Sequence, residues 1–254
     1  MRLRLHKLFQ SHTHNLTQFF TYLFKLQLTQ VIELLFKQLF EVPMIIAFIN
    51  QKGGCGKSTT AVHFAYWLTT AKRKKKVVLV DCDEQQSSLA WMQSLDVKIP
   101  SYSFADTNKI IEEIPELDNC NDYVVVDGPA SAQEITRAIL LISDLAILPV
   151  QPSGLDLHST AETIRLISQA QKVRGEQLIA AAFISKAQKK TRLKDEAIAF
   201  LEQAPNLTLL KTVIHQRVVV ADSFGQDATI WDLPKSSDSQ DEYKSLFSEI
   251  WKLT

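Results

Sequence analysis

The stretch 48-FINQKGGCGKSTT-60 joins the end of an apolar run to a glycine-rich turn and then to Lys57-Ser58-Thr59. It approaches the phosphate-loop pattern G-x-x-x-x-G-K-[ST], although Gln51 stands where the first glycine belongs. Glycines let successive backbone N–H groups turn towards a phosphate, and the N-terminus of the following helix adds a favourable dipole. The stretch therefore predicts a phosphate-binding loop between a strand and a helix. It also contains a second lysine, Lys52, which such a loop does not itself need.

The chain around this loop alternates between two patterns. Short apolar runs rich in β-branched residues predict strands at 44–50, 77–83, 122–127, 144–150 and 178–185. Helical patterns fall between them, near 58–72, 131–142, 156–173 and 192–203. This alternation predicts an α/β fold with a doubly wound, mostly parallel sheet and flanking helices, whose ligands bind at the carboxyl ends of the strands. We expect residues 44–254 to form this single P-loop domain.

The segment 1–43 differs in composition from the rest of the chain. It has no glycine, carries more basic than acidic residues, and places apolar residues at near-helical spacing. Gln and Thr interrupt the apolar residues, so the segment lacks the continuous block of a signal peptide or a membrane span. Two interpretations stay open: an amphipathic helix that binds a membrane surface or a partner, or an upstream extension outside the native protein. The second is favoured because Met44 opens the first strand as a natural start would.

Charge and cysteine content limit the class of protein. Lys and Arg together number 28, as do Asp and Glu, so any contact with nucleic acid must be a local patch. Three widely spaced cysteines argue against a disulfide framework and fit a reducing compartment. We expect a cytoplasmic protein.

Two acidic motifs follow the predicted strands. In 81-DCDEQQSS-88, carboxylates one residue apart in an extended chain point to the same side, here towards the phosphate loop. In 122-DYVVVDGPA-130, an apolar run ends in Asp127, as expected of a Walker B strand whose carboxylate holds Mg²⁺. Lys57 is expected to neutralise the β- and γ-phosphates of the nucleotide, and the Ser58 hydroxyl to ligate Mg²⁺. The order of these motifs predicts an ATP and Mg²⁺ site.

Taken together, the motifs resemble the ParA/MinD family of deviant Walker ATPases, and especially the short partitioning ATPases without a DNA-binding head domain. The resemblance covers residues 44 to about 231, and its motifs are 52-KGGCGKST-59, Asp81-x-Asp83 with Gln85, Asp127-Gly-Pro129, 149-PVQPSGLD-156 and 211-KTVIHQRVVVADS-223. It implies that the signature lysine, Lys52, reaches across a nucleotide-sandwich homodimer to the ATP bound by the partner. Lys52 would then couple nucleotide state to dimerisation.

The resemblance also implies a role for each matching residue. Asp83 would position the attacking water, and Asp81 would support the magnesium shell. Lys57 would cradle the phosphates, Ser58 and Asp127 would hold Mg²⁺, and Thr59 would help with the phosphates, in a cradle made of Gly53, Gly54, Cys55, Gly56, Lys57, Ser58 and Thr59. Cys55 is interpreted as an inert small residue.

This chain departs from the family pattern in both expected switch segments. Glu84 stands where the family often has Pro, and Gly128 and Ala130 stand within what is commonly Asp-Thr-Pro-Pro. We therefore expect ATP binding with a weak intrinsic ATPase activity, because phosphoryl transfer slows when part of the positioning machinery is missing. A ParB-like or other cargo adaptor would stimulate hydrolysis.

A basic run at 185-SKAQKKTRLK-194 is either a solvated face or half of a DNA-binding patch that a dimer doubles. Members of the resembling family bind DNA nonspecifically as ATP dimers. The residues expected to contact double-stranded DNA are Lys186, Lys189, Lys190, Arg192, Lys211 and Arg217. No base-reading motif accompanies them, so we expect salt-sensitive, sequence-independent binding on the nucleoid.

Two alternatives remain at this point. In the MinD branch a C-terminal amphipathic helix binds membrane, and 242-EYKSLFSEIWKL-253 has a comparable apolar stripe. Its acidic residues would be repelled by anionic lipid, so we expect it to pack against the core. The other alternative is a P-loop biosynthetic enzyme similar to dethiobiotin synthetase. The cargo, whether plasmid, chromosome or protein compartment, is left open.

Overall fold

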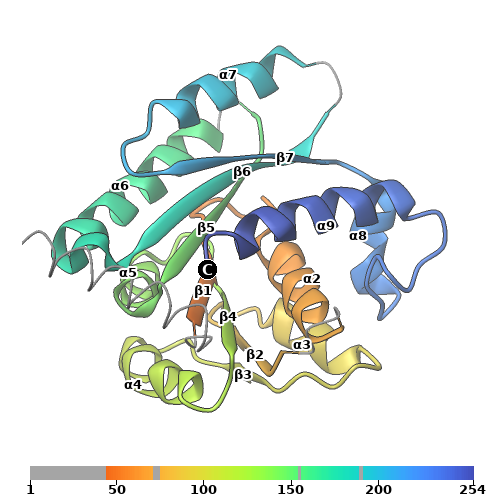
Figure 1. The fold of residues 1–254 in the computed structure, drawn as a ribbon, viewed down its shortest axis with the longest axis horizontal. Coiled ribbons are helices and arrows are strands. Elements are labelled where there is room, and N and C mark those ends of the chain that lie inside the picture. The colour runs from red at the N-terminus through yellow and green to blue at the C-terminus, as the bar shows by residue number, and fades with distance from the viewer. Residues whose placement is uncertain (1–43, 71–74, 154–155, 189–190) are drawn as a thin grey trace, which may run out of the picture. The chain divides into compact units, whose positions relative to one another are not determined.

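The structure is a computed structural model that describes residues 44–70, 75–153, 156–188 and 191–254. Its central feature is a parallel sheet of seven strands in the order β3-β2-β4-β1-β5-β6-β7 (Figure 1). The strands are β1 (Met44–Phe48), β2 (Val77–Asp81), β3 (Ser101–Ser103), β4 (Tyr123–Asp127), β5 (Leu145–Val150), β6 (Ile179–Ala187) and β7 (Thr208–His215). The predicted α/β class and parallel sheet are confirmed. The predicted N-terminal extension, 1–43, lies outside the described residues.

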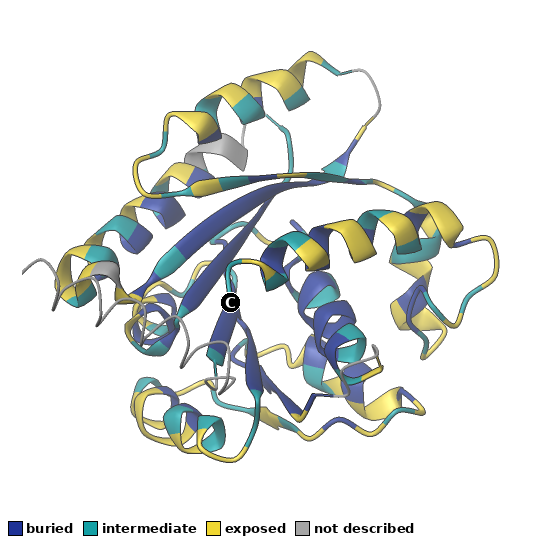
Figure 2. Ribbon diagram, in the orientation of Figure 1, coloured by how far each residue is buried: buried dark blue, intermediate teal, exposed yellow. Residues whose placement is uncertain are grey.

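Helices cover both faces of the sheet. They are α2 (Lys57–Thr70), α3 (Ser87–Ser94), α4 (Thr107–Asp118), α5 (Gln133–Ile142), α6 (Asp156–Arg174), α7 (Arg192–Glu202), α8 (Val218–Gly225) and α9 (Ser237–Trp251), with a short 3₁₀ turn at Gly175–Gln177. One hydrophobic cluster joins the sheet to α4, α5, α6 and α7, and the other joins it to α2, α3 and α9. The strands between these layers are buried while the outer sides of the helices are exposed (Figure 2). Burial on both faces explains why strands such as β4, YVVVD, read as continuous apolar runs.

The register of the central strands places the candidate site. Asp127 of β4 pairs with Phe48 of β1 on one side and with Asp81 of β2 on the other. All three residues stand at the carboxyl ends of their strands. The loops that follow them therefore emerge side by side, where a doubly wound sheet binds its ligands.

Two strands and three helices were not predicted. Strand β3 has only three residues, and its sequence Ser-Tyr-Ser has no buried member. Strand β7 is the other edge of the sheet and alternates buried with exposed positions, so threonines and a lysine interrupt its apolar pattern. Helices α3 and α8 are short, and α4 contains Pro115, a residue that normally argues against a helix interior. These elements were not predicted because their sequences lack a clear strand or helix pattern.

The C-terminal helix packs against the core, as predicted. Its apolar stripe, including Leu246, Phe247 and Ile250, is buried next to α2 in the second cluster. The helix begins at Ser237, five residues before the stretch 242–253 that carries the apolar stripe. Among the described residues, none of the helices has the length and apolar character needed to cross a membrane.

Candidate functional site

The loop between β1 and α2 has the backbone of a phosphate cradle. Gly54 and Gly56 take φ values of +75° and +98°, which side chains other than glycine rarely allow. The carbonyl oxygen of Gly54 accepts a hydrogen bond from the Lys186 ammonium (2.7 Å), and that of Cys55 accepts one from the Ser185 hydroxyl (2.6 Å). These bonds fasten the loop to strand β6.

The N–H groups of the same loop are left available. Those of Gly53, Gly54 and Gly56 have no acceptor within the part of the chain that the structure describes. The entry to the loop is fixed by Asn50, whose side chain donates to the Pro149 carbonyl (2.8 Å) and accepts from the N–H of Lys52 (3.0 Å). A fixed loop with inward N–H groups at a helix N-terminus is an anion-binding arrangement.

The two lysines of the motif have different surroundings. Lys57 is buried, and its ammonium donates to the carbonyl oxygen of Lys52 (3.1 Å) across the loop. Lys52 is half-buried, and its carbonyl also accepts from the Cys55 thiol (3.3 Å). The ammonium of Lys57 thus lies inside the cradle, in the position expected for neutralising phosphates.

Asp127 ends β4 in a buried position without compensation. It is 1% exposed, and neither carboxylate oxygen has a hydrogen-bond partner among the described residues. Burial and, to a smaller degree, the charge of Asp81 raise the pKa of Asp127 to about 7, although the nearby hydroxyls of Ser58 and Ser88 and the charge of Lys57 oppose the rise. A buried carboxylate costs several kcal/mol unless a cation or donor compensates it. Together with the Ser58 hydroxyl, Asp127 therefore has the oxygen donors that suit Mg²⁺.

The carboxylates of Asp81 and Asp83 have different hydrogen-bond partners. Asp81 is buried, and its two oxygens accept from the N–H groups of Asp83, Ser88 and Leu89 at 2.9, 2.9 and 3.0 Å. It therefore caps helix α3 from the end of the neighbouring strand. Asp83 is half-buried and accepts from the N–H of Gln85 (3.0 Å) and that of Ala130 (3.3 Å). Asp83 thus joins the segments after β2 and β4.

The departure from the family pattern at Gly128 has a steric reason. A Cβ atom at this position would lie 2.9 Å from Ile49 Cγ2 and 3.0 Å from the Phe48 carbonyl oxygen. The N–H of Gly128 donates to that same carbonyl (2.9 Å), which ties the start of the loop after β4 to the end of β1. Only glycine allows this close approach.

The two cysteines in the site are inert. Cys55 and Cys82 are each 1% exposed. Burial raises the pKa of the Cys55 thiol, and it raises that of Cys82 well above the ordinary value, with the charges of Asp127 and Asp81 adding to the rise. The thiolate is the reactive form of cysteine, so neither side chain is set up as a nucleophile. This agrees with the interpretation of Cys55 as a small inert residue.

The structure separates the residues that were grouped as DNA contacts. Lys186 takes φ +49° and bonds to the phosphate loop, which makes it part of the nucleotide site. Arg217 is held by Asp238 (3.0 Å) and Glu242 (2.7 Å) of α9, and Arg192 pairs with Glu196 (2.8 Å). Lys189 and Lys190 lie outside the described residues, and Lys211 is an exposed residue of β7.

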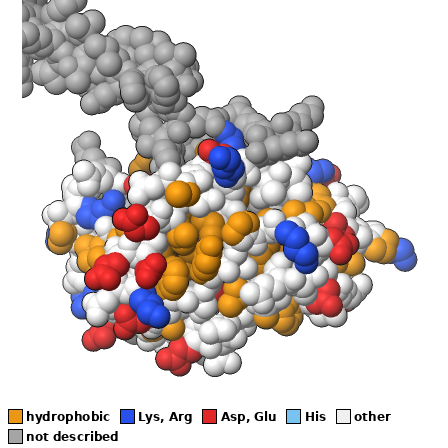
Figure 3. Space-filling view, turned by 90° about the horizontal axis from the view of Figure 1, so that it is seen from below, with side chains coloured by type: hydrophobic (Ala, Val, Ile, Leu, Met, Phe, Trp, Pro, Cys, Tyr) orange, Lys and Arg blue, Asp and Glu red, His pale blue; other side chains and the backbone are white. Residues whose placement is uncertain are grey.

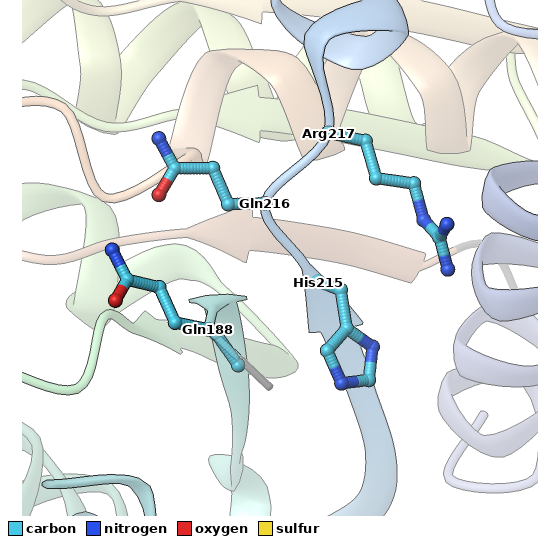
Figure 4. Close-up of a pocket in the computed structure, with 5 residues that line it drawn as sticks. Gln188, His215, Gln216 and Arg217 are labelled. Atoms are coloured by element: carbon cyan, nitrogen blue, oxygen red, sulfur yellow. The ribbon is translucent and has the colours of Figure 1, made fainter. Parts of the chain in front are cut away.

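Two pockets that the sequence did not predict share residues 215–217 as a common wall, and they are the two parts of the pocket region beside the phosphate loop. One part, of about 90 Å³, is lined by Gly56, Thr59 and Thr60 of the loop and α2 together with His215, Gln216 and Arg217. The other part, of about 420 Å³, is lined by Ala187, Gln188, His215, Gln216 and Arg217. In Figure 4 the amides of Gln188 and Gln216 extend towards the same space, whereas Arg217 extends to the opposite side. The sequence signal that could have predicted this pocket is the position of both glutamines directly after strands β6 and β7, because ligands bind at the carboxyl ends of such strands.

Comparisons with known proteins agree with this geometry. Residues 46–230 match the CobQ/CobB/MinD/ParA nucleotide binding domain. The "maintenance of carboxysome distribution protein A" of Halothiobacillus neapolitanus is 26% identical over 211 residues, covering 81% of this chain and 95% of the relative. The "sporulation initiation inhibitor protein Soj" of Bacillus subtilis is 25% identical over 250 residues, covering 81% and 97%.

Solved structures share the fold. An ATP complex of McdA from Cyanothece has a TM-score of 0.64 at 17% identity, covering 84% of this chain and 98% of that one. The septum site-determining protein MinD of Pyrococcus horikoshii, complexed with Mg-ADP, has a TM-score of 0.62 at 18% identity, covering 83% and 96%. At these identities the likeness shows the fold alone.

Proposed function

The chain belongs to the CobQ/CobB/MinD/ParA family of nucleotide-binding domains, and within it we propose an ATP-dependent switch that positions or partitions a cargo. ATP binding with Mg²⁺ dimerises the protein, the dimer binds DNA without sequence preference, and an adaptor on the cargo stimulates hydrolysis and release. The observation that carries the proposal is the phosphate loop with two lysines beside the uncompensated, buried Asp127.

In this proposal the loop binds the phosphates of the nucleotide, and the pocket beside it binds the base and ribose. The N–H groups of the glycines and the ammonium of Lys57 face the phosphates, and the Ser58 hydroxyl and Asp127 hold Mg²⁺. Mg²⁺ bound there supplies charge neutralisation between the β- and γ-phosphates. The pocket along His215 and Gln216 accommodates the base and ribose, because it opens directly from the loop at Gly56 and Thr59.

Hydrolysis depends on Asp83. Its carboxylate is half-buried at the mouth of the site and bonds only to backbone N–H groups among the described residues, so it retains capacity to accept from a water. Asp81 contributes by holding helix α3, and with it the Asp83 segment, in place. Among the described residues of one chain, the positive charges that we assign to the γ-phosphate are the lysines of the loop and Lys186. Intrinsic turnover is therefore expected to be slow.

Dimerisation depends on Lys52. The ammonium that neutralises the chain's own phosphates is that of Lys57, so the second lysine of the loop is proposed to contact the ATP bound by a second copy. Two copies facing each other across their nucleotides would make affinity between them depend on ATP. Such a dependence is what a positioning switch requires.

DNA binding is proposed for the dimer on a face other than the one in Figure 3. There the basic side chains lie singly among acidic ones around a central group of hydrophobic side chains. Among the described candidates, Arg192 and Lys211 are more exposed than Lys186 and Arg217, which are bonded to the loop and to α9. The family relatives include proteins named for carboxysome distribution and for chromosome partitioning. This chain's cargo is proposed to be of the same kind, a particle or replicon recognised through an adaptor.

The proposal is tested by binding to random-sequence duplex DNA with ATP, with ADP and without nucleotide, alongside light scattering for mass. We expect a dimer and DNA binding with ATP alone, and an affinity that falls steeply as salt rises, because phosphate contacts release counterions. An ATP dimer without DNA affinity would point instead to a membrane matrix, for which liposomes are the test. The burial of the apolar stripe of α9 argues against that outcome.

A further inference from the structure

Helix α9 is fastened to the edge of the sheet by two carboxylates. Strand β7 has a neighbour on one side only, so part of its backbone N–H groups lack a strand to bond to. Glu242 and Glu249, two helical turns apart on α9, accept hydrogen bonds from those groups. Both therefore serve the stability of the same helix–strand contact.

Glu242 makes additional contacts that Glu249 does not. Its carboxylate accepts from the N–H of His215 (2.9 Å), from His215 Nδ1 (2.9 Å) and from the Arg217 guanidinium (2.7 Å). The side chains of the three residues are each less than one third exposed, at 19% for Glu242, 27% for His215 and 24% for Arg217. One carboxylate thus fixes both the backbone and the side chains of the segment after β7.

That segment is the wall of the pocket next to the phosphate loop. His215 and Arg217 line both parts of the pocket, and between them stands Gln216, whose N–H donates to the Ala187 carbonyl (3.0 Å). The bond between Glu242 and Arg217 keeps the guanidinium turned away from the space that Gln188 and Gln216 share (Figure 4). The neutral amides of Gln188 and Gln216 therefore face that space, and the backbone of Gln216 is fixed by its bond to Ala187.

We propose that Glu242 is a positioning residue for the nucleoside end of the nucleotide site, acting from the C-terminal helix through His215 and Arg217. This rests on the proposed function, because it takes the pocket to hold the base and ribose of the nucleotide whose phosphates the loop binds. Glu242 contributes to affinity for the base and ribose but not to affinity for the phosphates, because its hydrogen bonds go to His215 and Arg217 and not to the phosphate loop.

Glu249 supplies a matched control. It accepts from the N–H groups of Lys211 (2.7 Å) and Thr212 (3.0 Å) and from the Thr212 hydroxyl. Neither Lys211 nor Thr212 lines either part of the pocket. Removing its charge loosens the same helix–strand contact without touching the pocket wall.

The experiment compares the full chain with its Glu242→Gln and Glu249→Gln variants. The dissociation constant of Mg·ADP is measured by calorimetry, and the inhibition constant of Mg·tripolyphosphate by displacement of labelled ADP. Glutamine has one acceptor oxygen, whereas three donors of His215 and Arg217 bond to the Glu242 carboxylate. We therefore expect Glu242→Gln to weaken ADP binding about five- to tenfold, which corresponds to the loss of roughly one charged hydrogen bond. Tripolyphosphate affinity should change less than about twofold, and Glu249→Gln should leave both constants near those of the wild type.

A merely structural role of Glu242 predicts a different pattern of ADP and tripolyphosphate affinities. If Glu242→Gln weakens ADP and tripolyphosphate equally, or if Glu249→Gln weakens ADP as much, the assignment is overturned. Should Glu242→Gln fail to fold, Glu242→Asp keeps the charge and is expected to show a smaller loss, again confined to ADP. A wild-type chain that binds tripolyphosphate but not ADP would overturn this inference alone, and one that binds neither would overturn the proposed function.

Discussion

At the scale of the residue, Asp127 carries a carboxylate that the nucleotide-free protein does not stabilise. Both oxygens are buried and have no hydrogen-bond partner among the described residues, and the negative charge of Asp81 adds to the penalty. We expect Asp127→Asn to raise the free energy of unfolding of the apo protein by about 1–3 kcal/mol, because an amide avoids the cost of burying a charge. Urea denaturation without nucleotide measures this.

The same variant should lose the benefit of magnesium. Wild-type protein with Mg·ADP is stabilised in proportion to ligand binding, and in Asp127→Asn the Mg²⁺-dependent part of that rise should disappear. Asp83→Asn is the control, since Asp83 already accepts hydrogen bonds from Gln85 and Ala130 and is not buried without compensation. A drop in apo stability on Asp127→Asn would mean that the carboxylate has a structural role instead.

At this scale the sequence predicts those functional residues that form one contiguous motif. The glycines, Lys57 and Ser58 follow one another in a fixed order, so their pattern predicts a loop without knowledge of the rest. Lys186 was assigned to DNA because its bond to the Gly54 carbonyl joins residues 132 positions apart. Glu242 was considered only as one of the acidic charges that anionic lipid would repel, since a glutamate on a polar helix face carries no signal of the strand it contacts.

At the scale of the element, His63 joins helix α2 to the C-terminal part of the domain. Nδ1 lies 2.7 Å from the Thr59 carbonyl, and Nε2 accepts from the N–H of Ile230 (3.1 Å), which assigns the proton to Nδ1. The ring is fully buried and lies 5.2 Å, centroid to centroid, from Trp91 and from Tyr243. Burial lowers the pKa of His63 to about 4, against smaller opposing effects of Thr59 and Asp232.

This makes stability depend on pH in a defined window. The unfolded state binds a proton near pH 6.5 while the folded state stays neutral until about pH 4, so the free energy of unfolding falls as pH falls through that range. The loss attributable to His63 is roughly 3 kcal/mol at its fullest. His63→Gln can donate to Thr59 and accept from Ile230 but does not titrate. We expect its stability to fall less than that of wild type between pH 7 and pH 5 in urea denaturation.

Parallel slopes for the two proteins in that range would contradict the assignment. Glu242 acts at lower pH: burial raises its pKa, but hydrogen bonds from His215 and Arg217 outweigh burial and lower it, so its contribution is lost only as pH falls below its ordinary value near 4.5. Asp127 and Asp118, whose pKa values are raised to about 7 and about 6, do titrate above pH 5, but the two proteins share them. The difference between the two slopes therefore measures the histidine.

The elements themselves were predicted where they are buried on both sides. The five interior runs are continuous stretches of apolar, β-branched residues, and each is a strand of the sheet. The edge strands β3 and β7 are missing from the prediction because their partners cover only part of their surface. Only two of the eight residues of β7 are buried, and a pair of glutamates from helix α9 accepts hydrogen bonds from its backbone.

At the scale of the whole molecule, the proposed dimer gives the two lysines of the loop different roles, Lys57 within its own chain and Lys52 towards the second copy. Lys57 donates to the backbone carbonyl of Lys52, as does the Cys55 thiol, so truncating the Lys52 side chain leaves both of these bonds in place. We expect Lys52→Ala to bind ATP within about threefold of wild type, a change of less than 1 kcal/mol, while remaining a monomer in light scattering with ATP. The same variant should bind DNA no better with ATP than with ADP.

Asp83→Ala tests the opposite side of the cycle. Removing this carboxylate takes away the group that we propose to orient the attacking water but leaves the loop, Lys57 and Lys52 unchanged. The ATP dimer should therefore form and persist instead of decaying as phosphate is released. Light scattering over the course of hydrolysis, with phosphate release measured in parallel, separates the two variants. Lys52→Ala removes the contact between the copies, whereas Asp83→Ala removes only the hydrolysis that ends this contact. The two variants should therefore differ in mass with ATP. If both remain monomers, the sandwich mechanism is wrong, and the additional lysine must act within its own chain.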